Sequence, residues 1–206
     1  KDQNLYNLIV RLATGALVSE VVLNFQDPGE TVSLHGLIVI LDTPFLMSAL
    51  DVSEEESHVV ASSICEQLRE KDAELAVFSH SVEELKDNLK GVIGEVDAGR
   101  GFGPTARRLP NRTFHAYASA LMQSPEARIK QDSIKIITPP KSTTSYKYFT
   151  AEDQDELERS IGYYYNKLSR ERDAESIAAV VRLRMDIRSK MSKLPAPIKK
   201  LPCTIV

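Results

Sequence analysis

Short runs of mainly apolar residues mark four places along the chain. They occupy residues 36–42, 75–78, 134–137 and 203–206. Short runs of this kind, with many β-branched residues and no polar alternation, predict strands that are buried on both faces. Strands buried on both faces are typical of a parallel sheet that helices cover on each side. The pattern therefore predicts a parallel sheet built from widely separated segments.

Between these runs the apolar residues recur at three- and four-residue intervals, which predicts helices. The expected helices span 44–50, 53–70, 82–96, 113–122, 151–169 and 173–191. Strands that alternate with helices indicate an α/β protein with a central parallel sheet. A further amphipathic helix is expected at 2–19, before a Pro-Gly turn. We therefore divide the chain into an N-terminal helical appendage with its connecting turn, 1–34, and a main domain, 35–206.

Several local signals refine the helix ends and faces. Ser53 and the glutamates after it predict a capping box at the start of the helix over 53–70. Its buried stripe is expected at Val59, Val60, Ile64 and Leu68. Ser79-His80-Ser81 is expected to cap the next helix. The Gly-, Pro- and Arg-rich segment 97–112 predicts a loop.

Charge and cysteine content restrict the function classes. A net charge of −3 gives no general attraction for nucleic acid, so any contact with RNA would need a local basic patch. No apolar run approaches the roughly 20 residues of a membrane span, so we expect no membrane contact. Cys65 and Cys203 lack metal-site spacing and favour reduced thiols in a cytoplasmic protein.

Three acidic side chains occupy comparable positions relative to the predicted elements. Asp42 ends the first strand, Glu84 lies in the first turn of the helix after the second strand, and Asp173 begins a helix. A parallel sheet would bring such positions to one edge, and clustered carboxylates are a common site for Mg²⁺ or Mn²⁺. Each also has a local alternative: Asp42 and Asp173 as helix caps, Glu84 as a partner of the helix dipole.

Three sequence motifs resemble those of the large bacterial PIN-like nucleases. They are Leu41-Asp42-Thr43-Pro44-Phe45-Leu46, the stretch from Phe78 to Leu85, and Arg172-Asp173-Ala174-Glu175-Ser176-Ile177 followed by Arg182-Leu183-Arg184. The order and spacing of the motifs match that family over residues 35–206. The resemblance implies a three-layer α/β/α PIN-like fold. It also implies a metal-dependent endoribonuclease that uses Mg²⁺ or Mn²⁺ to hydrolyse RNA phosphodiester bonds.

The resemblance assigns roles to individual acids. Asp42, Glu84 and Asp173 would be both the catalytic residues and the metal ligands, with Glu83 and Glu175 as secondary acids. Glu84 is preferred over Glu83 because it directly precedes an apolar leucine, as in the family pattern. The family has a further acid after its last core strand, and this chain stops at Val206. The domain is therefore expected to be incomplete at its C-terminus, and a catalytically inactive scaffold or an RNA- or protein-binding module is the alternative.

Two further contacts are expected with partners. Arg107, Arg108 and Arg112 in the segment 97–112 are candidates for the RNA backbone, with a solvated loop as the alternative. The N-terminal helix at 2–19 has no obvious place in the minimal fold. It would suit an interface with a partner domain or with a second copy of the chain.

Overall fold

Among the residues that the structure describes, four short parallel strands form a single sheet. They are β1 (Ile38–Ile40), β2 (Glu74–Phe78), β3 (Lys135–Ile137) and β4 (Cys203–Ile205), in the order β3-β2-β1-β4. The computed structural model describes residues 33–141, 149–161, 167–190 and 203–205. Every pair of neighbouring strands is parallel. The prediction of a parallel sheet is therefore confirmed, whereas the predicted helix at 2–19 lies outside the described residues.

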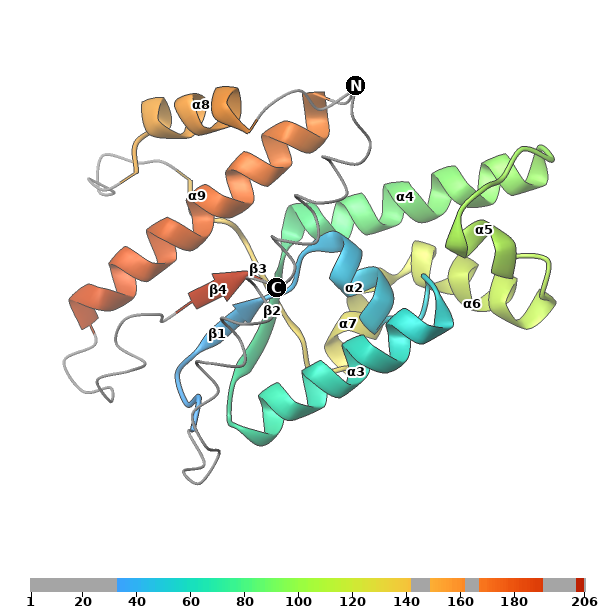
Figure 1. Cartoon of the computed structure of the whole chain (residues 1–206), viewed down its shortest axis with the longest axis horizontal. Helices are drawn as coiled ribbons and strands as arrows, with labels where there is room; N and C mark the ends of the chain where they lie inside the picture. The colour runs from blue at the N-terminus through green and yellow to red at the C-terminus, as the bar shows by residue number, and fades with distance from the viewer. Residues whose placement is uncertain (1–32, 142–148, 162–166, 191–202, 206) are drawn as a thin grey trace, which may run out of the picture. The chain divides into compact units, whose positions relative to one another are not determined.

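Helices fill each connection between the strands (Figure 1). After β1 come α2 (Thr43–Ala49) and α3 (Glu55–Glu70). The longer connection from β2 to β3 contains α4 (Ser79–Asp97), α5 (Pro104–Arg108), α6 (Arg112–Gln123) and α7 (Pro125–Gln131). Before β4 come α8 (Ala151–Ser160) and α9 (Lys167–Lys190). The chain is thus a mixed α/β protein in which helix predominates.

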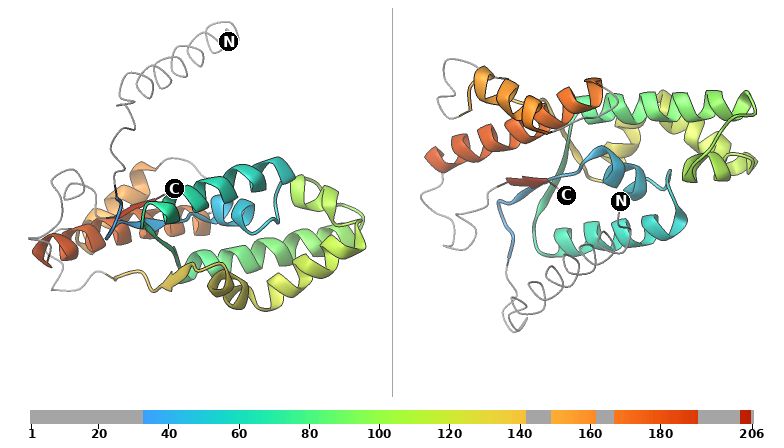
Figure 2. Two further views of the ribbon diagram at one scale, coloured as in Figure 1. Left: turned by 90° about the horizontal axis from the view of Figure 1, so that it is seen from below. Right: turned by 45° about the horizontal axis from the view of Figure 1, so that its top comes forward.

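The two faces of the sheet carry separate apolar clusters, since successive side chains of a strand point to opposite faces. One cluster joins Val39, Leu75 and Val77 of the sheet to buried side chains of α2, α3, α4, α6 and α7. The other joins Ile40, Ala76 and Phe78 to Ala179 and Val180 of α9. In Figure 1 and in the right-hand view of Figure 2 the strands accordingly lie between α3 and α9.

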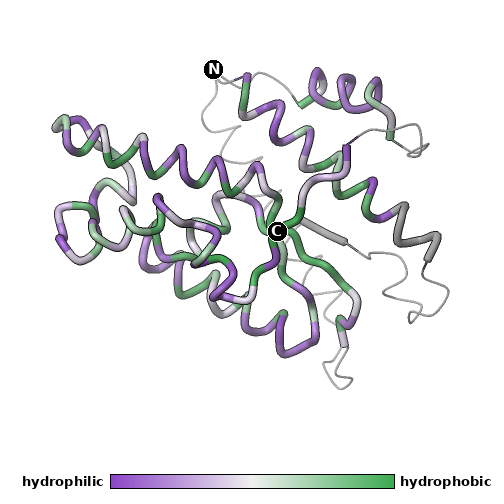
Figure 3. The backbone as a smooth tube through the Cα atoms, turned by 180° about the vertical axis from the view of Figure 1, so that it is seen from behind, coloured by the Kyte–Doolittle hydropathy of each residue, from purple (hydrophilic) through white to green (hydrophobic). Residues whose placement is uncertain are grey.

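The strands are the most continuously hydrophobic part of the chain, as Figure 3 shows for β1 and β2 in green. Val39, Ile40 and Leu41 are all buried, as are the last four residues of β2. No polar alternation is possible in strands that are covered on both sides. This is why the apolar runs located β1 and β2 in the sequence.

The strand order creates a switch point beside β1. From β1 the chain moves outward to β2 and β3, and it then returns to place β4 on the other side of β1. In open parallel sheets, ligands bind at the carboxyl ends of the strands where the order reverses in this way. Asp42 lies two residues beyond the end of β1, at this switch point.

Several predicted helix ends are wrong. The helix after β2 begins at Ser79, with Phe78 as its N-cap, so Ser79 and Ser81 are helical residues rather than caps. The α9 helix already includes Lys167, so Asp173 does not begin a helix, and the expected helix end near 169 falls within α9. Ser53 does not cap α3, whose N-cap is Glu54 without a side-chain hydrogen bond. These helix ends were predicted from single residues of the kind that cap helices, and such residues did not mark the observed ends.

The predicted buried stripe of α3 is also wrong in part. Val59 and Val60 are 68% and 60% exposed, whereas Ala61 and Cys65 are buried. Adjacent positions on a helix are about 100° apart, so the face that carries Ala61 and Cys65 turns both valines outward. The smaller side chains lie toward the sheet because they permit a closer approach of α3.

The segment 97–112, which was predicted as a loop, is partly helical. It contains α5 and the start of α6, and Leu109 is buried with Phe114 and Ala118 in a small cluster against α4. No separate helix was predicted for α7, which follows α6 after Ser124. Among the residues described, none of the helices combines the length and apolar character that a membrane span requires.

Candidate metal centre

Asp42 stands at the N-cap position of α2 but does not act as a capping side chain. Its backbone carbonyl accepts the N–H of Leu46 at 2.8 Å, as the first turn of a helix requires. Its carboxylate makes no capping hydrogen bond, and Pro44 occupies the first turn, where it removes one donor. The half-buried carboxylate is therefore not explained by the start of α2.

Glu84 is held by the residue next to Asp42. The Thr43 hydroxyl donates a hydrogen bond of 2.7 Å to Glu84 Oε2. Thr43 is only 2% exposed, so this contact fixes α4 against the end of β1. Glu84 lies in the second turn of α4, beyond the first turn where a carboxylate interacts most with the helix dipole. The position of Glu84 therefore does not support the alternative role of a partner for the helix dipole.

Asp173 completes the group from the opposite face of the sheet. Partial burial raises the pKa of its carboxyl group, and the charges of Asp42 and of Glu84 raise the pKa further. Since Coulomb interactions fall off with distance, Asp173 is within electrostatic reach of both Asp42 and Glu84. Asp173 is a residue of the α9 interior and not its N-cap. We call Asp42, Glu84 and Asp173 the acidic triad.

Small side chains on α9 allow Asp173 to reach this position. Ala174, Ala178 and Ala179 are all buried, and Ala179 packs on Ile40, Ala76 and Phe78 of the sheet. Alanine adds little width to a helix face, so the backbone of α9 lies close over the strands. This close approach brings Asp173 within electrostatic reach of the ends of β1 and α4.

His80 connects α4 to α9 beside the acidic triad. Its Nε2 lies 2.7 Å from Ser176 Oγ. Its Nδ1 lies 3.5 Å from Glu175 Oε2 without forming a hydrogen bond. Burial lowers the pKa of the imidazole, while the charge of Glu175 opposes that change. At 9% exposure, His80 is a packed interhelical contact and not the cap or surface residue that its position suggested.

The two secondary acids differ in position. The Glu83 side chain is exposed, whereas Glu84 is half-buried and bonded to Thr43. Of these two adjacent acids, Glu84 and not Glu83 adds to the raised pKa of Asp173, after burial and the charge of Asp42. Glu175 faces His80. The structure therefore brings together Asp42, Glu84 and Asp173, and it places Glu83 and Glu175 at the edge of this group.

The predicted RNA-contact residues lie at the other end of α4, where α5 packs. From Glu84 to the last residue of α4 the helix rises about 20 Å. Arg108 binds the Asp51 carboxylate at 2.9 Å and the Ser53 carbonyl at 2.8 Å, and its guanidinium lies 4.1 Å from the centre of the Phe114 ring. The guanidinium of Arg108 is thus occupied by contacts within the protein, and it is less available to bind an RNA phosphate. Exposed Arg107 pairs with Glu54 at 2.8 Å, and Arg112 is exposed.

The carboxylates of the acidic triad are suitable ligands for a divalent cation, but they are not arranged in a coordination geometry. Carboxylate oxygens are the ligands that Mg²⁺ and Mn²⁺ prefer. The pKa of Asp173 is raised by burial first and then by the charges of Asp42 and Glu84. Within the described ranges, however, no three His, Cys, Asp or Glu side chains are already arranged to hold a metal ion. Binding of an ion would therefore require rotation of the carboxylates.

Two residues of this region were not identified as functional from the sequence. Thr43 orients Glu84, and Ser176 binds His80. Thr43 directly follows Asp42 at a strand end, and this position was a usable signal. Ser176 gave no such signal, because its role depends on the packing of α9 against α4.

Comparisons with protein-family models, with curated proteins and with solved structures find no match for this chain.

Proposed function

We propose that this chain is a PIN-like endoribonuclease that hydrolyses RNA phosphodiester bonds with Mg²⁺ or Mn²⁺ held by Asp42, Glu84 and Asp173. The proposal includes a three-layer α/β/α PIN-like architecture for the domain. The parallel strand order β3-β2-β1-β4 and the helices on both faces of the sheet support that part. The three sequence motifs of the acidic region support the family.

One observation carries the proposed activity. Asp42 follows β1 at the switch point of the sheet, the hydroxyl of the next residue, Thr43, holds Glu84 of α4, and Asp173 of α9 lies within electrostatic reach of both carboxylates. Burial raises the pKa of Asp173, and repulsion from the charges of Asp42 and Glu84 raises it further. Such repulsion costs stability, and a bound cation would offset it. Neither a capping hydrogen bond of the Asp42 side chain nor a first-turn position of Glu84 or Asp173 accounts for the group.

When bound, a divalent ion would lower the pKa of an attacking water and stabilise the charge that develops on the phosphate. The acidic triad would hold the ion, with oxygen ligands only. Thr43 holds the Glu84 carboxylate at the end of β1. The contact of His80 with Ser176 joins α4 to α9, the helix that carries Asp173. Glu83 and Glu175 are secondary acids at the edge of the site, and Arg107 and Arg112 are the remaining candidates for distant RNA-backbone contacts.

The experiment is a cleavage assay on single-stranded RNA with Mn²⁺ or Mg²⁺. We expect cleavage by the natural sequence, none in EDTA, and none by Asp42→Asn. Glu156→Gln is a matched control, because Glu156 is an exposed acid on α8. A folded, metal-supplied protein that leaves RNA intact would exclude the nuclease function for this chain.

A second candidate is a PIN-like scaffold without activity. The hydrogen bond between Thr43 and Glu84 favours it, because this bond gives Glu84 a structural role that needs no metal. In a scaffold, neutralising any member of the acidic triad would leave RNA binding unchanged, and Mn²⁺ would not change the stability of the protein.

A further inference from the structure

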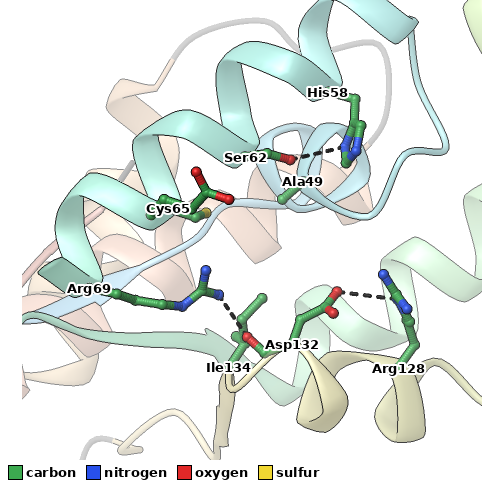
Figure 4. A pocket seen from close by; sticks show the side chains of 9 residues that line it. Ala49, His58, Ser62, Cys65, Arg69, Arg128, Asp132 and Ile134 are labelled. Carbon is green, nitrogen blue, oxygen red and sulfur yellow. Dashed lines mark hydrogen bonds and ion pairs between the residues drawn. The ribbon is translucent and has the colours of Figure 1, made fainter.

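A cavity of about 170 Å³ lies between α3 and α7, near the edge of the sheet where β2 and β3 begin. Arg69 lies at the end of α3, five residues before β2, and Asp132 directly follows α7, three residues before β3. Asp42, by contrast, follows the carboxyl end of β1. The cavity is therefore separate from the acidic triad. Figure 4 shows its lining.

One face of α3 forms the upper wall of this cavity as drawn in Figure 4. His58, Ser62, Cys65 and Arg69 follow one another at intervals of four, three and four residues, so they lie on one face of the helix. His58 Nδ1 lies 2.9 Å from the Ser48 carbonyl oxygen, which can only accept a hydrogen bond. The proton of a neutral His58 is thus on Nδ1, and its Nε2 is an acceptor.

Two arginines on opposite sides of the cavity have unsatisfied donors. Arg69 donates from Nη2 to the Asp132 carbonyl oxygen at 2.7 Å. Arg128 Nε lies 3.2 Å from Asp132 Oδ2, an ion pair whose angle does not make a hydrogen bond. Three buried side-chain atoms lack a hydrogen-bond partner in the part of the chain that the structure describes, and two of them are Arg69 Nε and Arg128 Nε.

Arg69 Nε is buried without an acceptor, and an unpaired buried N–H on a charged group costs about 1–3 kcal/mol. Arg128 Nε has its ion pair with Asp132 but no hydrogen bond. The fork of a guanidinium matches the paired oxygens of a carboxylate or a phosphate. A water occupies roughly 30 Å³, so the cavity has room for such a group and several attached atoms. Asp132 and Glu66 are the carboxylates in the lining, and they oppose an anion without outnumbering the arginines.

The cavity is suited to binding rather than to covalent chemistry. Cys65 is its one thiol among the lining residues, and burial raises the pKa of that thiol. A protonated thiol is a poor nucleophile. The polar groups that remain are donors and acceptors at fixed positions on α3 and α7.

We propose that this cavity is a binding site for a small oxyanion, which Arg69 and Arg128 hold from opposite sides. The shared ligand chemistry is a group with at least two acceptor oxygens, either a phosphate or a carboxylate. The site is independent of the acidic triad and of the nuclease function proposed above.

The test titrates the whole chain with inorganic phosphate, and in parallel with acetate, at constant ionic strength, by calorimetry and by thermal unfolding. We expect saturable binding of at least one of the two anions and a rise in unfolding temperature. The anion that binds more tightly shows whether the ligand of this site carries a phosphate or a carboxylate. Arg69→Gln and Arg128→Gln should each weaken binding about tenfold or more.

Two variants keep the test decisive if an arginine variant fails to fold. Ala49→Leu narrows the cavity and keeps every charge, so it should weaken binding, whereas Asp132→Asn removes a competing carboxylate and should strengthen it. Arg159→Gln, on the exposed surface of α8, should change nothing. Asp42→Asn should also bind normally, which separates this site from the metal centre. Absence of saturable binding, or equal binding by all variants, would overturn the proposal.

Discussion

The Thr43 hydroxyl donates a 2.7 Å hydrogen bond to Glu84 Oε2. This contact joins the turn after β1 to α4, 41 residues further along the chain. It places a carboxylate from α4 beside the Asp42 backbone at the switch point of the sheet. The acidic triad therefore depends on a neutral residue that no acid-based motif includes.

Thr43→Val tests this contact, because valine keeps the shape of threonine and removes only the donor. We expect a loss of about 1.5–3 kcal/mol in the free energy of unfolding, the range for hydrogen bonds to charged groups. Urea denaturation measures it. Thr113→Val, at an exposed position, should change stability by less than about 0.5 kcal/mol. Equal stability of the two variants would show that the bond to Glu84 contributes nothing.

Asp173→Asn should stabilise the metal-free protein at neutral pH. The pKa of Asp173 is raised on folding by burial and by the charges of Asp42 and Glu84. A raised carboxyl pKa means that stability is greatest while the group is protonated and falls as pH rises through the folded-state value. The gain from Asp173→Asn should therefore be large at pH 7 and should vanish below the unfolded-state pKa near 3.9.

Unfolding temperatures in EDTA, recorded from pH 3.5 to 7.5, measure that difference. Glu156→Gln on the exposed surface of α8 serves as the control and should follow the natural sequence at every pH. A loss of stability in Asp173→Asn at pH 7 would mean that the negative charge of Asp173 is favourable in the fold, contrary to the repulsion inferred here.

His80 should make the fold sensitive to mild acid. Burial lowers the pKa of His80 below its usual value near 6.5. A lowered imidazole pKa gives stability that is present above the unfolded-state value and is lost as pH falls through the folded-state value. His80→Gln should therefore flatten the decline in unfolding temperature below pH 6.5. His35→Gln, at an exposed site, should leave the decline as it is; a similar change in both variants would contradict the prediction.

Arg108 and Arg107 are adjacent but should behave differently. Arg108 is 18% exposed at its side chain and combines an ion pair, two carbonyl contacts and a contact with the Phe114 ring. Arg108→Gln should cost about 2–3 kcal/mol of stability. Arg107→Gln removes a surface ion pair and should cost less than about 1 kcal/mol. Urea denaturation of both variants decides this, and equal losses would contradict the structural role of Arg108.

The sheet could be located from the sequence because burial on both faces leaves apolar runs without polar interruption. This holds for β1 and β2, whose residues are almost all buried. The helix ends could not be located as well. Ser53 and Ser79 have the right side chains for caps, yet tertiary packing placed the helix starts elsewhere. Val59 and Val60 were misplaced because hydrophobicity alone does not show that Ala61 and Cys65 allow α3 closer to the sheet.

The acidic triad could be proposed from three positions relative to predicted strands and helices, and its residues do approach one another. The helix boundaries on which that reasoning relied were wrong for Glu84 and Asp173, and the role of the three acids in metal binding stays a prediction. The cavity between α3 and α7 could not be anticipated, because β2 and the helices α4, α5 and α6 lie between Arg69 and Arg128 in the sequence. The ion pair between Arg108 and Asp51 could not be anticipated either, because the two residues are distant in the sequence.

The most direct measurement is Mn²⁺ binding to the natural sequence and to variants of the acidic triad, by calorimetric titration after removal of metals with a chelator. We predict saturable binding in the micromolar to millimolar range, lost in Asp42→Asn and in Asp173→Asn and retained in Glu156→Gln. Absence of Mn²⁺ binding, or binding that survives both triad substitutions in folded protein, would contradict the assignment of Asp42, Glu84 and Asp173 as a metal centre.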